Sequence, residues 1–210
     1  HPKDLADVAE AMPTDRVAEF LRALPAARAA DVLEYLDEEL RSELLEAMST
    51  EQAVALVSEM TPDDRADILE ELEEETADEI LQDLPEAERQ ETERLLQYDA
   101  DSAGGLMTTE FVSVSQDLTS EQALVLVRVA ARSGRKEAMH AIYVTDDRGS
   151  VVGVMSLREL VAAAEDSKVA DLAWTEVVKV PATADRAEVA RITSEYDLVA
   201  GTGAVVAATA

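Results

Sequence analysis

Three carboxylates lie at the start of one short segment of the chain, at Asp63, Asp64 and Asp67. If this segment is a helix, Asp63 and Asp67 are four residues apart and lie on the same face. Like charges at this spacing repel each other unless a cation lies between them, and that face carries no basic residue. Capping of the helix N-terminus would account for Asp63 or Asp64, but not for Asp67. The spacing therefore indicates a cation-binding pair at Asp63 and Asp67.

Other metal-binding or catalytic chemistry has little support in the sequence. There is no cysteine, which excludes disulfides, thiolate zinc sites and cysteine nucleophiles. The two histidines are His1, at the terminus, and His140, at the start of an expected strand. No P-loop, dinucleotide fingerprint or nucleophile–base pair is present, and Ser156 is better explained as a helix cap. We therefore expect no enzymatic activity, and we expect Trp174 and Tyr196 to pack in the core.

The chain is strongly acidic, with 46 acidic and 18 basic residues and a net charge of −28. This charge repels phosphate backbones and anionic lipids, so nucleic acid and a membrane surface are not expected as partners. Hydrophobic residues make up 47% of the chain, which argues against disorder. No signal peptide is visible, and the longest uncharged run, residues 198–210, is too short to span a bilayer. A soluble protein in the cytoplasm is expected.

Charge and glycine content divide the chain near residue 100. Residues 1–100 hold 30 acidic and 8 basic residues, a net of −22, whereas residues 101–210 hold 16 and 10, a net of −6. All seven glycines lie between Gly104 and Gly203. Two regions of different construction therefore meet at this point.

An internal repeat positions the carboxylates of the first region. Apolar residues recur every twelve positions, at Met12, Leu24, Leu36, Met48, Met60, Leu72 and Leu84. Further apolar residues stand four and three positions before each of these, which gives every unit one apolar stripe on a short helix. The apolar residue that recurs every twelve positions is called the repeat mark. It is followed by helix-start residues such as Pro13, Ser49 and Thr61. Each unit is predicted to be a helix of about eight residues and a tight turn.

Helices this short are stable only when stacked, so the repeat predicts a superhelical solenoid over residues 1–97. A coiled coil is disfavoured because twelve is not a multiple of the heptad and the prolines would interrupt it. Most acidic residues are expected to form the solvated faces of these helices. Residues 86–98 contain no further proline and are expected to form a longer helix that leads out of the stack.

The second region alternates strands and helices. A Thr119–Gln122 capping box starts one of the helices, and residues 146–149 form a turn between two strands. The expected strands are 110–114, 140–145, 151–155 and 177–180, and the expected helices are 119–133, 156–164 and 184–196. The fold class is therefore α plus α/β, with a small mixed sheet covered by helices.

The twelve-residue repeats and the junction Ser102-Ala103-Gly104-Gly105-Leu106-Met107 resemble the cytosolic part of the MgtE magnesium transporter family. The most specific signal is Ala-Gly-Gly-Leu-Met before a cystathionine-β-synthase-type (CBS) module, where the two glycines allow a tight reversal. The resemblance implies a helical repeat domain at 1–97, a first CBS module at 98–166 and a second at 167–210. The second module is expected to be truncated or degenerate, because Gly201-Thr202-Gly203 replaces the expected hairpin.

In that family the cytosolic part senses Mg²⁺, and the resemblance implies that Mg²⁺ bridging acidic domain interfaces closes the pore of a transporter. The implied metal ligands are Asp31, Asp63 and Asp67 of the helical domain, the carbonyl of Gly105, and Asp185, Glu188 and Asp197 of the second CBS module. Oxygen ligands suit a hard cation that keeps several waters. The acidic composition agrees with this mechanism, because divalent cations would relieve the self-repulsion.

The resemblance also implies partners and a location. These are a homodimer through the CBS modules, the transmembrane domain of the same transporter if one follows Ala210, and the cytosolic face of the plasma membrane. CBS modules often bind adenine nucleotides, but Ala141 stands where an aromatic residue would serve and Glu159 where Asp is usual. The sequence therefore gives no firm basis for a nucleotide cofactor. Two other functions stay open, a soluble adenine-nucleotide sensor and an interaction scaffold that uses the concave face of the solenoid.

Overall fold

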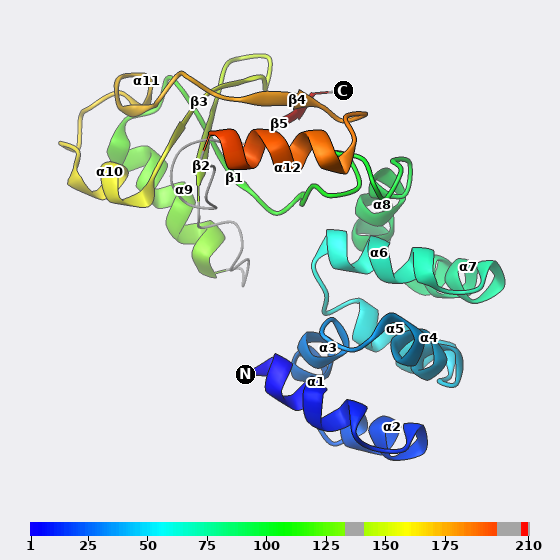
Figure 1. Ribbon diagram of the computed structural model, residues 1–210. Helices are drawn as coiled ribbons and strands as arrows, with labels where there is room; N and C mark the ends of the chain where they lie inside the picture. The colour runs from blue at the N-terminus through cyan, green and yellow to red at the C-terminus, as the bar shows by residue number, and fades with distance from the viewer. Residues whose placement is uncertain (133–140, 197–206, 210) are drawn as a thin grey trace. The chain divides into compact units, whose positions relative to one another are not determined.

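The computed structural model describes residues 1–132, 141–196 and 207–209. The chain forms two compact units, His1–Ala100 and Asp101–Ala210 (Figure 1). The first unit contains helices only, and the second contains strands and helices. This confirms the expected fold class, short helical repeats followed by an α/β region. His140 and Asp197 lie outside the described residues.

Each helix of the first unit occupies one unit of the twelve-residue repeat. The helices are α1 (Pro2–Glu10), α2 (Thr14–Arg22), α3 (Ala26–Leu33), α4 (Glu38–Glu46), α5 (Thr50–Val57), α6 (Pro62–Glu71), α7 (Glu74–Asp83) and α8 (Glu86–Leu95). The expectation of a longer helix at 86–98 is wrong. After α8 ends at Leu95, the amide of Tyr98 donates to the carbonyl three residues earlier, so the chain makes a turn instead of continuing the helix.

The helices pack in two columns, so the structural repeat is a pair of helices. The odd-numbered helices α1, α3, α5 and α7 pack in succession, and so do the even-numbered helices α2, α4, α6 and α8. The apolar stripes form one core, in which Leu21, Leu33 and Leu45 are at most 1% exposed. Burial of one such side chain contributes about 1.5 to 3 kcal/mol, so stacking holds together helices that would not form alone.

Arginines recur every 24 residues on the even-numbered helices and bind the ends of the preceding helices. Arg41, Arg65 and Arg89 donate to the carbonyl seven residues earlier in each case, those of Glu34, Ser58 and Gln82. The last carbonyls of a helix have no partner within the helix, so these guanidinium groups satisfy acceptors that would otherwise be unpaired. Arg65 is 3% exposed and also donates to the carbonyls of Val57, Met60 and Glu88 and to Thr92 Oγ1.

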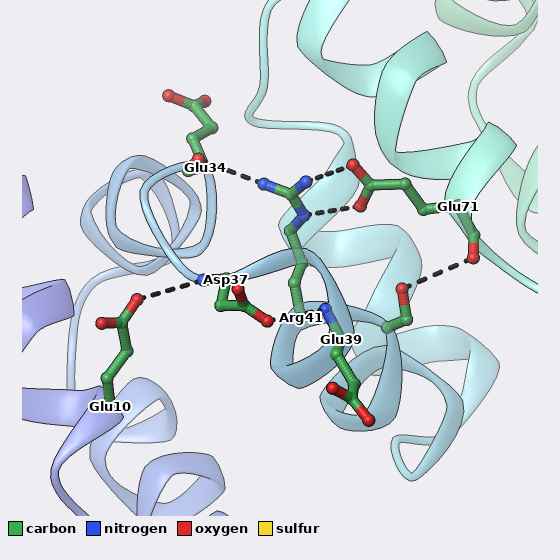
Figure 2. Close-up of polar contacts among 7 residues, drawn as sticks. Glu10, Glu34, Asp37, Glu39, Arg41 and Glu71 are labelled. Carbon is green, nitrogen blue, oxygen red and sulfur yellow. Dashed lines mark hydrogen bonds and ion pairs between the residues drawn. The ribbon is translucent and has the colours of Figure 1, made fainter.

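Acidic side chains join helices at positions 36 residues apart. Glu10 Oε1 accepts from the amide of Asp37 at 3.1 Å (Figure 2), and Glu46 Oε1 accepts from the amide of Glu73 at 3.3 Å. These amides precede α4 and α7, where N–H groups have no helical partner and the helix dipole favours negative charge. Part of the acidic surface that was expected to be only solvated therefore connects one helix to another.

The second unit begins with a three-stranded sheet of order β1-β2-β3. Strand β1 (Val112–Ser115) pairs in parallel with β2 (Ile142–Thr145), which pairs in antiparallel with β3 (Val151–Met155). Helices α9 (Ser120–Arg132) and α10 (Leu157–Ala162) share a buried core with this sheet. The capping boxes expected from Thr119 and Ser156 are both present.

A second β-α-β sequence follows. Its elements are α11 (Val169–Leu172), β4 (Lys179–Pro181), α12 (Arg186–Glu195) and β5 (Ala207–Thr209), with β5 parallel to β4. The order β4, α12, β5 repeats the order β1, α9, β2. Within the described residues no counterparts of β3 and α10 follow. The sequence analysis missed α11 and β5, because the first is a single turn and the second lies in a small-residue run without alternation.

The chain between the two β-α-β sequences extends the first sheet. Trp174 and Val154 exchange two backbone hydrogen bonds of 2.8 and 2.9 Å. A Cβ at Gly153 would lie 2.8 Å from the Cβ of Ala173, so glycine is required for this approach. The expectation that Trp174 and Tyr196 pack in the core is wrong, since they are 53% and 56% exposed. Trp174 is held through its backbone instead.

No helix within the described stretches is long and apolar enough to cross a bilayer.

Candidate functional site

The first unit gathers four carboxylates from α3 and α6. Asp31 and Glu34 come from α3 and its C-terminal cap, and Asp63 and Asp64 come from the first turn of α6. The pKa of Glu34 is raised from its usual 4.5 to about 7, first by burial and then by the carboxylates of Asp64, Asp31 and Asp63. Arg41 lowers it in part. A cation would be attracted to this cluster, because each of these acids makes ionisation of the next one harder.

Arg41 fixes the backbone beside the cluster. Its Nη1 donates to the Glu34 carbonyl at 3.1 Å, and its Nε donates to Glu71 Oε2 at 2.7 Å, while Nη2 pairs with the other oxygen of Glu71. Figure 2 shows the Glu34 carboxylate pointing away from this guanidinium. Arg41 therefore holds the backbone of Glu34 in place, while its charge is paired mainly with the Glu71 carboxylate.

Asp63 is the least satisfied member of the cluster. Helix α6 has Thr61 at its N-cap and Pro62 at its first position, so neither Asp63 nor Asp64 is the cap that the sequence suggested. Thr61 Oγ1 donates to Asp64 Oδ2 at 2.6 Å. Asp63 Oδ1 is buried, and within the described part of the chain no donor is hydrogen-bonded to it. A buried carboxylate oxygen without a donor is costly, so this atom is available to a cation.

Asp67 lies in a different electrostatic environment from Asp63. It is exposed, and its charge acts on Glu70 together with that of Asp99. The pKa of Glu70 is raised, first by burial and then by Asp67 and Asp99. Asp63 and Asp67 lie four residues apart on α6, as the spacing predicted, and they act on different acids, Glu34 and Glu70.

The other predicted ligands among the described residues lie in both units and have protein partners of their own. Asp31 is 3.8 Å from Arg28 in a half-exposed ion pair. In the second unit, Asp185 is the N-cap of α12 and accepts from the amide of Glu188 at 2.8 Å. Asp185 also forms a β-bridge with Ser102, whose hydroxyl accepts from the Gly105 amide at 3.2 Å. The structure thus brings Asp185 and the junction together.

No group of three or more His, Cys, Asp or Glu side chains in the described residues is arranged closely enough to hold a metal ion.

Sequence reasoning missed Glu34 and Glu70, whose pKa values are raised. They occupy the same repeat position, two residues before the repeat mark and 36 residues apart. Their shared position was the available signal, but only the packing of the helices shows that Glu34 is partly buried and that Asp99 acts on Glu70.

Phe111 and Tyr143 of the second unit were also missed. The sequence analysis considered position 141 for a nucleotide-stacking residue, whereas Phe111 and Tyr143 lie edge to face with ring centroids 5.4 Å apart. Phe111 is exposed, and burial raises the pKa of Tyr143.

Comparisons with known proteins agree with both units. The MgtE intracellular N domain family matches residues 1–101, and the CBS domain family matches residues 103–166. The crystal structure of the cytosolic domain of the Mg²⁺ channel MgtE in complex with ATP has a TM-score of 0.88 and 35% identity, and the match covers 94% of this chain and 80% of that one. The chain belongs to the MgtE family. A second structure, the soluble part of a magnesium transporter, has a TM-score of 0.84 and 27% identity over 94% of this chain and 77% of that chain.

The curated MgtE relatives are much longer than this chain. The magnesium transporter MgtE of Thermus thermophilus is 42% identical over 109 residues, which are 52% of this chain and 24% of that protein. The MgtE of Bacillus subtilis is 35% identical over 114 residues, 54% of this chain and 25% of that protein. The chain thus spans about a quarter of the MgtE relatives that it matches. Its helical repeats and CBS-type unit correspond to the cytosolic domain of MgtE.

Proposed function

We propose that this chain is the Mg²⁺-responsive regulatory region of a magnesium transporter, at the cytosolic face of the plasma membrane, and that Mg²⁺ binding to its acidic surfaces favours a closed pore. The transporter's transmembrane domain is its proposed partner. The observation that carries the proposal is Asp63 Oδ1, a buried carboxylate oxygen without a hydrogen-bond donor in the described residues, beside Asp31, Glu34 and Asp64. Family membership supplies the class of protein.

The electrostatics of the first unit support a weak site for a hydrated divalent cation. Its residues carry a net charge of −22 in the sequence, so any bound cation relieves repulsion over the whole unit. Carboxylates that do not converge on one point suit an ion that keeps its waters, and such binding is expected to be on the order of millimolar. In this proposal Asp31, Asp63 and Glu34 attract one ion, and Asp67 belongs to a neighbouring position.

Gly105, Asp185, Glu188 and Asp197 stay predicted ligands. The first three lie near the junction and the start of α12, and Asp185 is already used as a helix cap. A carboxylate that caps a helix with one oxygen keeps lone pairs for a cation, so the two roles are compatible.

We also propose a homodimer through the CBS-type unit. Helix α9 presents an apolar stripe of Val125, Leu126 and Val129, which are 47 to 63% exposed, and Val161 of α10 is 63% exposed. Helices α9 and α10 contact each other, so these exposed side chains offer an apolar surface to a second copy.

The metal site is tested by thermal unfolding in MgCl₂ against NaCl of matched ionic strength. At about 10 mM Mg²⁺ and a millimolar Kd, binding to the folded state would add about 1.4 kcal/mol. Asp63→Asn keeps the shape of the side chain and should remove most of the Mg²⁺-specific stabilisation. Asp15→Asn is the matched control, because Asp15 occupies the same repeat position and the same place in its helix but is exposed. Equal Mg²⁺ responses of the two variants would contradict the proposal.

A second candidate function is adenine-nucleotide binding, favoured by the ATP in the related MgtE structure and by the exposed ring of Phe111 beside Tyr143. Titration calorimetry with ATP tests it. A heat of binding that Phe111→Ala removes supports the second candidate, and the absence of binding at millimolar ATP excludes it.

A further inference from the structure

A groove on the helical unit has an apolar floor and an acidic rim. It lies between α6, α7 and the end of α8 and has a volume of about 300 Å³. Its floor consists of the aliphatic side chains of Leu69, Leu72, Ala77, Leu81 and Leu96. The last three of these are only partly buried. Water in contact with this floor would be released when an apolar side chain entered, which favours binding.

Three exposed carboxylates surround this floor, those of Glu70, Glu74 and Asp78. The charges of Asp67 and Asp99 act on Glu70 and make this side of the groove more negative. The rim therefore attracts cations next to the apolar floor and repels anionic lipids and nucleic acids.

A second groove at the same repeat positions lacks this charge. It has a volume of about 190 Å³ and lies 48 residues earlier, where Leu21, Leu24 and Met48 correspond to Leu69, Leu72 and Leu96. The floor is thus a consequence of the repeat. The rim is not, because Arg22 and Ala26 stand where the later groove has Glu70 and Glu74.

We propose that the groove between α6, α7 and α8 docks a polypeptide segment that carries an aliphatic side chain flanked by Lys or Arg. The volume is at the lower end of ligand pockets and suits one or two aliphatic side chains. An amphipathic helix with leucines at i and i+4 would place one face on the floor and its basic residues on the rim. The docking proposal does not rest on the proposed Mg²⁺ response.

Fluorescence polarisation of the full chain in EDTA tests the proposal. The probe is a labelled synthetic helix-forming peptide of about 15 residues, with leucines at i and i+4 and lysines on both sides. Two control peptides replace either the leucines by serine or the lysines by glutamate. The expected Kd of the probe is on the order of tens of micromolar, and both control peptides should bind at least about tenfold more weakly.

Two pairs of protein variants separate docking from general charge attraction. The double variant Glu70→Gln/Glu74→Gln should weaken binding of the probe about five- to tenfold. The control Glu38→Gln/Glu39→Gln changes the net charge by the same amount away from the groove and should leave binding of the probe unchanged. Ala77→Phe fills the acidic groove and should prevent docking, and Ala55→Phe fills the other groove as its control.

Each outcome decides for or against this groove. Losses confined to the Glu70/Glu74 and Ala77 variants, together with loss for the serine peptide, support it. Equal weakening by both glutamine pairs, equal binding of the serine peptide, or no binding of the probe at millimolar protein overturns it. If Ala77→Phe does not fold by circular dichroism, the glutamine pairs, which remove no packed atoms, decide the question.

Discussion

Replacement of Glu34 by glutamine is expected to stabilise the metal-free protein above pH 7 and to leave it unchanged near pH 5. The folded protein holds the Glu34 proton up to about pH 7, whereas the unfolded chain releases it near 4.5. Between these values the folded state binds more protons, so the stability that Glu34 contributes at low pH is lost as the pH rises. Glutamine resembles the protonated acid in shape and stays neutral, so it does not undergo this loss.

The size of the effect follows from the pKa of Glu34 and its partial burial. A change from 4.5 to about 7 corresponds to about 3 kcal/mol if the group is fully shielded from water. Glu34 is only partly buried and solvent screens its neighbours, so we expect about 1 to 2 kcal/mol at pH 8. For a unit of this size, 1 kcal/mol corresponds to about 4 to 8 °C in Tm.

Thermal or urea unfolding of Glu34→Gln and the unmodified protein in EDTA, between pH 5 and 8, checks this expectation. Glu59→Gln, an exposed position, is the control for loss of one charge. The reasoning is refuted if the stability difference does not grow between pH 5 and 8, or if Glu59→Gln gives the same curve. A growing difference of the opposite sign would mean that the Glu34 carboxylate is stabilised by its surroundings.

Four further substitutions test the hydrogen bonds and the packing. Arg65→Met should cost about 3 kcal/mol in chemical denaturation, because four carbonyls lose a buried donor, whereas Arg89→Met, at a partly exposed position, should cost about 1 kcal/mol or less. Gly153→Ala should destabilise the second unit by about 1 to 3 kcal/mol, and unchanged hydrogen exchange of β3 would contradict the close contact with Ala173. Asp185→Ala should cost about 1 kcal/mol in calorimetric unfolding without Mg²⁺, and an unchanged melt would remove its capping role.

The helices of the first unit could be predicted well from the sequence, because residues within each helix and its turn determine where it begins and ends. A twelve-residue spacing, a helix-start residue and an apolar stripe suffice to locate them, and Leu21, Leu33 and Leu45 are buried as the stripe requires. The pairing of alternate helices could not be read from the same spacing, because it depends on contacts between residues about 24 positions apart. The guanidinium of Arg65 illustrates this, since nothing in its local sequence shows that it is buried.

The candidate site was predicted in part. Asp31 and Asp63, two of the predicted metal ligands, both act on Glu34, which was not recognised. The periodicity of a single helix put Asp67 beside Asp63, and in the structure Asp67 acts on Glu70 of the same helix together with Asp99 from the segment after α8. Helical spacing describes one face of one helix. The charges that matter here come from several segments, and only the fold brings them together.

The arginines at every second repeat limit how such a chain can change its length. Removal or duplication of a single twelve-residue unit would exchange the two columns for every later helix and would leave Arg41, Arg65 and Arg89 on different columns. Removal or duplication of two units would keep each helix, and each of these arginines, in its own column. Viable length variants of this solenoid should therefore differ by 24 residues, and an engineered single-repeat deletion should aggregate where a two-repeat deletion folds.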